Sequence, residues 1–246
     1  MLYKYCTAER IDVLKNLRVG FTRFTALNDP FECLFALEPR EDEQVAAEND
    51  NYVAERAEVM VWLEARIGQL GVLCLSRTRR SLLMWSHYAN NHTGFLVGLD
   101  ENDTFFTARA FYVDPNYGVE EPLRLPGFGS LREVAYSGRR AIIGHGDAVP
   151  WDFFFQKSPE WRYEKEVRMF RTLSEATTRV NNGATGLFAL PATSIQEVVI
   201  GSRMATDHSD SIVSALNQID LRHVRLFRAE LAHLTFALEF TRIRPH

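Results

Sequence analysis

The chain has 246 residues, of which 46% are hydrophobic and 24% are charged, as in an ordinary globular protein with a sizeable core. Its formal net charge of −4 argues against a broad electrostatic grip on nucleic-acid phosphates. No stretch approaches the roughly 18 apolar residues of a membrane span, and the start MLYKYCTAER lacks the apolar run of a signal peptide. We therefore expect a soluble, cytoplasmic protein with no membrane partner.

The first elements follow from local patterns at the amino terminus. Leu2–Tyr5 is predicted to form a strand, and a helix capped by Thr7 should follow, because apolar residues recur at helical spacing up to Leu17. Gly20 stands where a glycine that ends a helix is expected, and Phe21–Thr25 then alternates like a second strand.

Further along the chain, Asn28-Asp29-Pro30 is typical of a turn, and an apolar stripe predicts a helix within residues 40–70. Ser81 is expected to cap a helix that ends at Asn90–Asn91, and prolines and glycines predict long loops between residues 100 and 150. A short helix is expected at Trp151–Gln156 and another helix at Asp207–Ile219, with Ile219 on its apolar face. The remaining strands are expected at Val72–Ser76, Phe95–Leu99, Leu131–Tyr136, Glu166–Thr172, Gly186–Leu190, Glu197–Ile200, Val224–Ala229 and Leu234–Thr241.

The strands outnumber the helices and are irregularly spaced, which favours an α+β fold over a wound parallel sheet. We expect a mixed, mostly antiparallel sheet, which can be split, with flanking helices. No repeat, low-complexity tract or clean linker divides the chain, so residues 1–246 are interpreted as a single domain. The cysteines are widely spaced and form no CxxC pair, which favours reduced, buried thiols over a zinc site; they are Cys6, Cys33 and Cys74.

Four segments, far apart in the sequence, are richer in polar and aromatic groups than a packing face requires, and functional sites are commonly assembled from such element ends. They are LYKY at 2–5, LNDPFE at 27–32, MWSHYANNHTG at 84–94 and FQKSPEWRYEKEVRMF at 155–170. On the first strand, Tyr3 and Tyr5 share one face and Lys4 points to the other.

The last of these segments carries the strongest chemical signal. On a strand, Glu164, Glu166 and Arg168 would share one face, with the two carboxyl groups roughly 7 Å apart. One carboxyl could then have a raised pKa, or be held by Arg168 or Lys157, and such a pair suits general acid–base catalysis. The alternative is a solvent-facing strand whose Glu–Arg pair contributes little.

The segment at 84–94 has two interpretations. Trp85 is expected to be a buried anchor, whereas His87 is a lone titratable group that can be either functional or bonded to a backbone carbonyl. His92 follows five residues later, which is not the spacing that places two metal ligands on one helix face. In the segment at 27–32, Asp29 can cap a turn while Phe31 fills the core, or its polar groups can face a ligand.

The order of these segments, extended by IQEVVIG at 195–201, resembles the bacterial family known as domain of unknown function 2971 over nearly the whole chain. MWSHYANNHTGF and WRYEKEVR are the specific parts of the resemblance. This family implies no activity, so the mechanism has to come from the residues.

A looser resemblance, to ADP-ribosyltransferase-type domains, rests on the tyrosine-bearing first strand and a helix ending in Leu17-Arg18-Val19-Gly20. Such domains bind NAD in the cleft of a split α+β sheet, and Lys4 would have to replace their usual first-strand histidine or arginine. The resemblance implies a polar first-strand residue, a midway aromatic or hydroxyl residue and a late glutamate, at Tyr3 or Tyr5, His87 or Tyr88, and Glu164 or Glu166.

The leading interpretation is therefore an NAD- or nucleotide-using transferase of a bacterial conflict system such as phage defence, acting on an unidentified macromolecule. Its candidate catalytic residues are Glu164, Glu166, His87 and Tyr88, and its candidate NAD- or nucleotide-binding residues are Tyr3, Lys4, Tyr5, Trp85, Lys157 and Arg168. Three alternatives stay open. The first is a non-catalytic module that binds a small anion through Lys157, Arg162 and Arg168. The second is a metal-dependent nuclease that uses Asp29, Glu32, Glu164 and His87, and the third is that the segments only define the fold.

Overall fold

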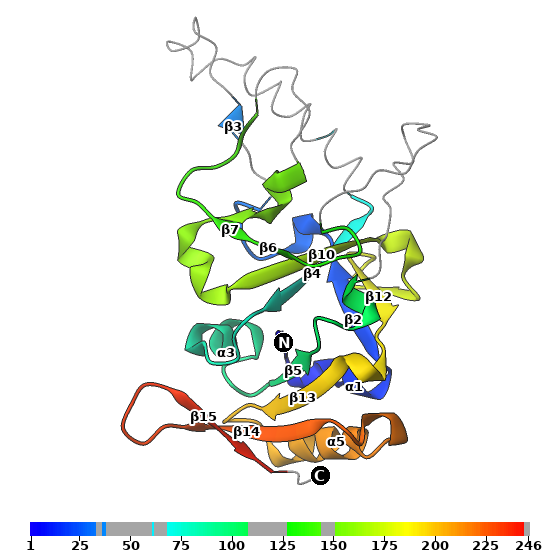
Figure 1. Ribbon diagram of the computed structural model, residues 1–246, viewed down its shortest axis with the longest axis vertical. Helices are drawn as coiled ribbons and strands as arrows, with labels where there is room; N and C mark the ends of the chain where they lie inside the picture. Colours follow the sequence, from blue (N-terminus) through cyan, green and yellow to red (C-terminus); the bar gives the residue numbers. More distant parts are fainter. Residues whose placement is uncertain (33–35, 38–60, 62–67, 108–126, 144–150, 244–246) are drawn as a thin grey trace, which may run out of the picture.

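The computed structural model describes residues 1–32, 36–37, 61, 68–107, 127–143 and 151–243, and the fold is given for these residues (Figure 1). The helix expected within residues 40–70 lies almost wholly outside them, as does Cys33. Cys6 and Cys74 are free thiols, and burial raises the pKa of both. Among the described residues, no helix is long and apolar enough to cross a lipid bilayer.

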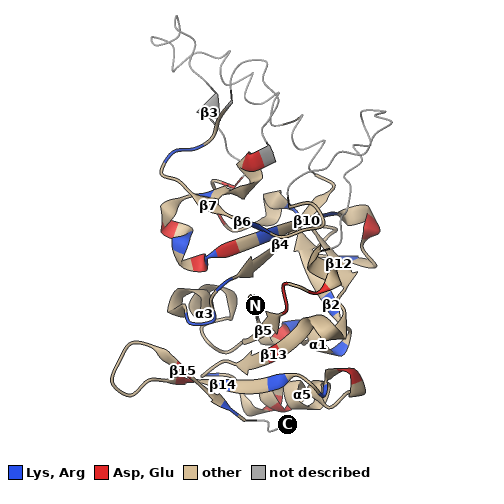
Figure 2. Cartoon of the chain, viewed as in Figure 1, with Lys and Arg blue, Asp and Glu red and all other residues tan. Residues whose placement is uncertain are grey.

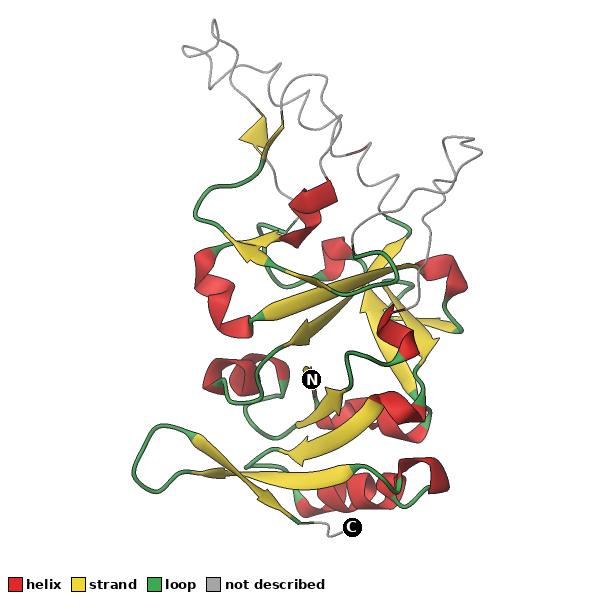
Figure 3. Ribbon diagram, viewed as in Figure 1, coloured by secondary structure: helices red, strands yellow, loops and turns green. Residues whose placement is uncertain are grey.

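The expected α+β architecture is confirmed, with one large, mostly antiparallel sheet that does not close into a barrel (Figure 3). Its strands are β1 (Leu2–Cys6), β2 (Arg18–Thr22), β4 (Leu70–Ser76), β5 (Phe95–Leu99), β6 (Arg132–Glu133), β10 (Glu166–Thr172), β11 (Thr178–Val180), β12 (Thr185–Ala189), β13 (Ile195–Ile200), β14 (Arg225–Leu231) and β15 (Leu238–Arg242). Along the sheet the order is β11-β12-β2-β4-β1-β5-β13-β14-β15, with β10 paired to β4 and β6 to β10. Two short parallel ladders join β3 (Ala36–Leu37) to β8 (Ile142–Ile143) and β7 (Ala135–Tyr136) to β9 (Gln156–Lys157).

The sheet is split along one edge of β4. All seven residues of β4 pair with β10, so β1 and β2 have to share the opposite edge. On that edge β2 pairs at Val72 and β1 pairs at Ser76, which leaves Cys74 between the two contacts. The ammonium group of Lys4 donates a hydrogen bond of 3.0 Å to the backbone carbonyl of Cys74 and so bridges the split. The site described below lies at this opening.

The helices are short apart from one. They are α1 (Asp12–Lys15), α3 (Leu82–Tyr88), α4 (Thr104–Thr107) and α5 (Thr206–Leu216), and the 3₁₀ turns are η1 (Ala8–Ile11), η2 (Phe24–Ala26), η3 (Trp151–Phe155), η4 (Pro159–Glu164), η5 (Leu173–Glu175), η6 (Ala192–Ser194) and η7 (Ile219–Leu221). Helix α3 begins as predicted, since the side chain of Ser81 accepts a hydrogen bond from the backbone N–H of Met84. It also ends as predicted, where Asn90 and Asn91 take left-handed backbone conformations.

Helix α3 is anchored to the sheet by the expected tryptophan. Trp85 is fully buried, its indole N–H donates to the carbonyl of Arg79 over 2.8 Å, and its ring packs edge-on against Tyr5 with centroids 5.4 Å apart. These residues belong to a cluster formed by α3 with β1, β5, β13, β14 and β15, and a second and larger cluster involves α1 and α5. The first cluster fixes the position from which Tyr88, the last residue of α3, reaches the site.

The amino-terminal elements differ from the prediction in their boundaries. Gly20 does not end a helix but lies within β2, and the left-handed residue after α1 is Leu17, with φ of 50°. Strand β2 starts at Arg18 rather than at Phe21, since its pairing with β12 already includes Arg18 and Val19. Thr7 precedes the first turn, but its side chain makes no capping hydrogen bond.

Other predicted elements are shifted or divided. Residues 131–136 form two short strands in different sheets rather than one strand. The last helix stops at Leu216, and Ile219, expected on its apolar face, is 75% exposed. Phe31 is 57% exposed and does not fill the core. Glu164 belongs to the turn η4, so the predicted strand face begins only at Glu166.

Candidate functional site

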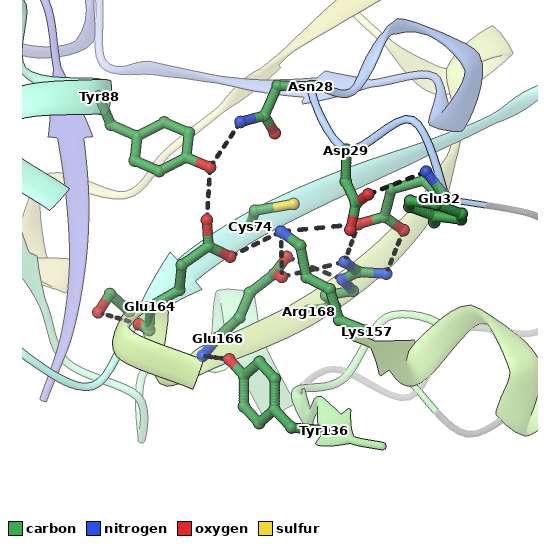
Figure 4. A network of polar contacts seen from close by, with 12 residues as sticks. Asn28, Asp29, Glu32, Cys74, Tyr88, Tyr136, Lys157, Glu164, Glu166 and Arg168 are labelled. Atoms are coloured by element: carbon green, nitrogen blue, oxygen red, sulfur yellow. Dashed lines mark hydrogen bonds and ion pairs between the residues drawn. The ribbon is translucent and has the colours of Figure 1, made fainter. Parts of the chain in front are cut away.

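Five charged side chains form a buried network beside the split in the sheet (Figure 4). Three are acids and two are bases, and their side chains are at most 4% exposed: Glu32, Lys157, Glu164, Glu166 and Arg168. Strand β10 and the neighbouring η4 and β9 supply four of them, and the turn after Asn28 supplies Glu32 (Figure 2 marks the charged residues along these elements). Two of the four segments singled out in the sequence thus provide the whole network.

Arg168 organises the inner half of the network. Its guanidinium group holds Glu32 with both terminal nitrogens and Glu166 with Nε and Nη2, over 2.8 to 3.0 Å for Glu166. A further hydrogen bond of 2.7 Å reaches the carbonyl of Phe154. Because Arg168 is fully buried, each of these partners replaces water that the guanidinium has lost.

Lys157 organises the outer half and connects it to the inner one. Its ammonium group donates to Glu164 over 2.7 Å and to Glu166 over 3.4 Å, and lies 3.7 Å from Glu32. The two glutamates are two residues apart, but Lys165 between them takes a left-handed conformation with φ of 45°. This turn, rather than a regular strand, allows both carboxylates to reach one lysine.

Tyr88 connects the network to α3. Its hydroxyl donates a hydrogen bond of 2.5 Å to Oε1 of Glu164, and the side-chain amide of Asn28 donates to the same hydroxyl over 2.8 Å. The contact brings the segment at 84–94 and the segment at 27–32 together with the late glutamates. Burial and the negative charge of Glu164 raise the pKa of Tyr88, so the phenol stays protonated as a donor.

The two late glutamates have opposite pKa shifts. Burial alone would raise the pKa of Glu166, but the charge and hydrogen bonds of Arg168, together with Lys157, lower it to about 2. For Glu164, burial outweighs the opposing effect of Lys157, and the nearby Glu166 adds to it, so its pKa is raised. Burial also raises the pKa of Glu32 against the influence of Arg168. Glu166 is therefore held as a fixed anion, whereas Glu164 can exchange a proton more easily.

The charges of the network do not balance. When all five groups are ionised, three negative and two positive charges leave a surplus of one negative charge. Glu32 and Glu166 surround Arg168, whereas Glu164 has Lys157 as its one cationic partner among the described residues. We therefore assign the surplus to the end of the network that holds Glu164 and Tyr88.

A hollow of about 140 Å³ opens onto this end of the network and is called the acidic hollow below. Glu32, Glu164, Glu166, Lys157 and Tyr88 all contribute to its wall. The remaining wall comes from the split itself and from its surroundings: Tyr3, Lys4, Tyr5, Thr22, Leu27, Asn28, Val72, Cys74, Leu75, Ser76 and Met84. A ligand in this hollow would meet carboxylate, ammonium, phenol and amide groups.

Three residues singled out in the sequence lie elsewhere. His87 is exposed, contacts the rings of Tyr88 and Tyr163, and does not line the hollow. Trp85 lies in the core beneath α3 rather than in the wall. Arg162 is exposed and does not line the hollow.

One residue that supports the site is not predicted from the sequence. The hydroxyl of Tyr136 accepts a hydrogen bond of 2.8 Å from the backbone N–H of Glu166 and fixes the start of β10. Burial raises the pKa of this hydroxyl to about 12. The sequence predicts a strand that ends at Tyr136. It does not predict the pairing of β7 with β9 that brings this residue to the site, because no local pattern encodes that pairing.

The residues proposed for a metal-dependent nuclease do not form a ligand set. Asp29 accepts a hydrogen bond from the backbone N–H of Phe31 in the predicted turn, and Glu32 is held by Arg168. Within the part of the chain that the structure describes, no group of three or more histidine, cysteine, aspartate or glutamate side chains could hold a metal ion. The carboxylates of Glu32 and Glu164 are paired with Arg168 and Lys157 instead.

Comparison with known proteins identifies one family. Residues 84–169 match the model of a family described as a protein of unknown function (DUF2971), which confirms the resemblance seen in the sequence for this segment. The match runs from α3 to β10 and includes Tyr88, Lys157, Glu164, Glu166 and Arg168. No curated protein and no solved structure matches the chain.

Proposed function

Since residues 84–169 match the model of a family of unknown function, we propose a function from the geometry of the site. The acidic hollow binds the sugar of a nucleotide, with NAD as the first candidate, and Glu164 assists cleavage of the bond between that sugar and its base. The chain would then act as a transferase, similar to an ADP-ribosyltransferase. The observation that carries the proposal is the buried carboxylate of Glu164, which Tyr88 and Lys157 hold in the wall of the hollow.

The reaction develops positive charge on the sugar, and the carboxylate of Glu164 is the group proposed to lie beside it. Breaking the bond between the anomeric carbon and the base nitrogen sends the electron pair away with the base and leaves an oxocarbenium-like sugar. A carboxylate fixed beside that sugar stabilises the developing charge without reorganisation. The acceptor then bonds to the anomeric carbon and gives up a proton, which Glu164 can take because its pKa is raised.

The other residues would position Glu164. Lys157 holds one carboxylate oxygen, and Tyr88, steadied by Asn28, holds the other. Glu166 is fully committed to Arg168 and Lys157 and is assigned a positioning role. This assignment favours Glu164 over Glu166 as the late glutamate of the resemblance.

The proposal is tested by incubating the protein with NAD and measuring nicotinamide release for the wild type, Glu164→Gln and Tyr88→Phe. Glu164→Gln should lower the rate by about 100-fold or more, the size expected for loss of a catalytic acid–base group. The fold should persist, because the substitution leaves two carboxylates facing two cations. His87→Ala is the matched control on α3 and should keep the wild-type rate, since His87 lies outside the wall.

Absence of nicotinamide release from the wild type, with or without macromolecular acceptors, would contradict the proposal.

A role in a conflict or defence system adds a cellular readout. Expression of the wild type should then be toxic under conditions in which Glu164→Gln is tolerated, at equal protein levels.

A second candidate is a non-catalytic ligand-binding module, and one observation favours it. Each carboxylate oxygen of Glu164 and Glu166 already accepts a hydrogen bond from the protein, so the network is satisfied without a substrate. A nucleotide that raises the melting temperature of the wild type but is never cleaved would support this candidate, because binding to the folded state stabilises it whether or not chemistry follows.

A further inference from the structure

A second hollow of about 190 Å³, the basic hollow, adjoins the acidic one. The two share part of their walls: Lys4, Tyr5, Thr22 and Tyr88. The basic hollow extends from this common wall toward η1 and the start of β2, on the side of the split away from Glu164. The two hollows are therefore direct neighbours.

The lining of the basic hollow is positively charged. Lys4 on β1, Arg10 on η1 and Arg18 on β2 all contribute to it, and no acidic residue does among those described. The chain as a whole is acidic, so a hollow with three cations and no acid in its wall runs against the overall composition. Such a surface attracts an anion to one place.

These three cations are only weakly committed to the protein. Lys4 donates to the carbonyl of Cys74, and Arg18 makes a hydrogen bond of 3.4 Å to the hydroxyl of Thr178. Arg10 contacts Asp12 through Nε at 3.2 Å, in an ion pair whose side chains are 42% and 29% exposed. Pairs this exposed contribute little and are readily exchanged for a better partner.

The backbone places Arg10 over the hollow. A Cβ atom added to Gly20, which lines the same hollow, would lie 3.4 Å from Nη2 of Arg10. The guanidinium group therefore lies against β2 rather than extending into solvent. Its two terminal nitrogens, with those of Arg18, are the groups that hold phosphate oxygens most effectively in proteins.

We propose that the basic hollow is a phosphate subsite, in which Arg10, Arg18 and Lys4 bind the phosphate or pyrophosphate group of the ligand whose sugar lies in the acidic hollow. This inference rests on the proposed function for the place of the sugar, and it narrows the substrate class to phosphorylated N-glycosides. It also replaces the sequence-based assignment of anion binding to Lys157 and Arg168, whose charges are already paired with buried carboxylates.

Titration calorimetry of the full chain with inorganic pyrophosphate tests the subsite, at one fixed low ionic strength because salt screens such contacts. The wild type should show saturable binding, and the double variant Arg10→Gln/Arg18→Gln should bind about 100-fold more weakly, at roughly tenfold for each charge-assisted contact. The control Arg140→Gln/Arg222→Gln removes the same charge from exposed positions outside both hollows and should bind like the wild type. Non-saturable binding by the wild type, or equal weakening in both double variants, would overturn the subsite.

Kinetics separate this inference from the proposed function. If NAD is cleaved, Arg10→Gln/Arg18→Gln should lower kcat/KM for NAD about 100-fold but leave cleavage of the unphosphorylated nicotinamide riboside unchanged. Selective loss of pyrophosphate binding with no cleavage of NAD by any form would uphold the subsite and refute the proposed function. Cleavage of NAD with wild-type efficiency by Arg10→Gln/Arg18→Gln would uphold the function and refute the subsite.

Discussion

The two hollows share a wall but hold their charges in opposite ways. Beside the acidic hollow, the five charged side chains of the network are almost completely buried and each is paired. In the basic hollow, three cations are partly exposed and their hydrogen bonds are few or long. Removing one partner of a buried ion pair destabilises the fold because it leaves the other charge buried and unpaired. A weakly paired charge at the surface can instead bind a ligand. Substitutions in the network beside the acidic hollow should therefore lower the stability of the fold, whereas substitutions in the basic hollow should weaken ligand binding.

The largest effect should come from Arg168→Met. This change leaves three buried carboxylates with Lys157 alone, so the free energy of unfolding should fall by about 3–5 kcal/mol, as for other broken buried pairs. Urea denaturation measures it. Arg77→Met is the control: its ion pairs with Glu101 and Glu133 are at the surface, and the expected loss is about 1 kcal/mol. Equal losses for both would remove the contrast between buried and exposed charges.

The contribution of Glu166 to the stability of this network should depend on pH. The folded-state pKa of Glu166 is lowered to about 2, so the folded state favours the ionised form and its contribution is present above the ordinary pKa of about 4.5. That contribution is lost as the pH falls from about 5 to about 2. The difference in free energy of unfolding between the wild type and Glu166→Gln should therefore shrink over this range, measured by denaturation at several pH values. A constant difference would mean that Glu166 stabilises the fold by packing rather than by charge.

A smaller loss is expected from Tyr136→Phe. The change removes the acceptor for the backbone N–H of Glu166 and should lower the free energy of unfolding by about 1–2 kcal/mol. Tyr163→Phe is the matched control, because none of the described hydrogen bonds uses its hydroxyl and the ring stays in place. A loss in the control as large as in Tyr136→Phe would trace the effect to the removal of a hydroxyl in general.

The smallest effect on stability belongs to the basic hollow. Arg10→Gln/Arg18→Gln should change the free energy of unfolding by no more than about 0.5 kcal/mol, since both side chains are partly exposed and weakly paired. Chemical denaturation of the variant used in the binding experiment gives the value directly. A loss above about 2 kcal/mol would show that these arginines stabilise the fold, as Arg168 is expected to do.

The sequence predicts what local rules control. Ser81, Asn90 and Asn91 mark the ends of α3 because capping depends on neighbouring residues alone, and the burial of Trp85 follows from its place on that helix. The convergence of the polar segments at 27–32, 84–94 and 155–170 was also expected, and the contacts of Tyr88 with Asn28 and Glu164 connect all three.

Other features depend on contacts between distant segments. The split in the sheet arises because β1 and β2 meet the same edge of β4, and no local pattern encodes which strands pair. Arg10 and Arg18 resemble isolated surface charges in the sequence, and only the fold shows that they line one hollow with Lys4. The sequence predicts a helix end at Gly20 because glycine is the usual left-handed residue, whereas Leu17 takes that conformation here.

The left-handed conformation of Lys165 has a consequence for how the site can vary. The left-handed conformation costs a residue other than glycine about 1–2 kcal/mol. The side chain of Lys165 is exposed. What matters here is its backbone, whose carbonyl accepts from the N–H of Arg77 and whose reversal directs two acids at one ammonium group. Glycine or asparagine should serve equally well at this position, whereas valine or isoleucine would pull the carboxylates apart without touching either of them.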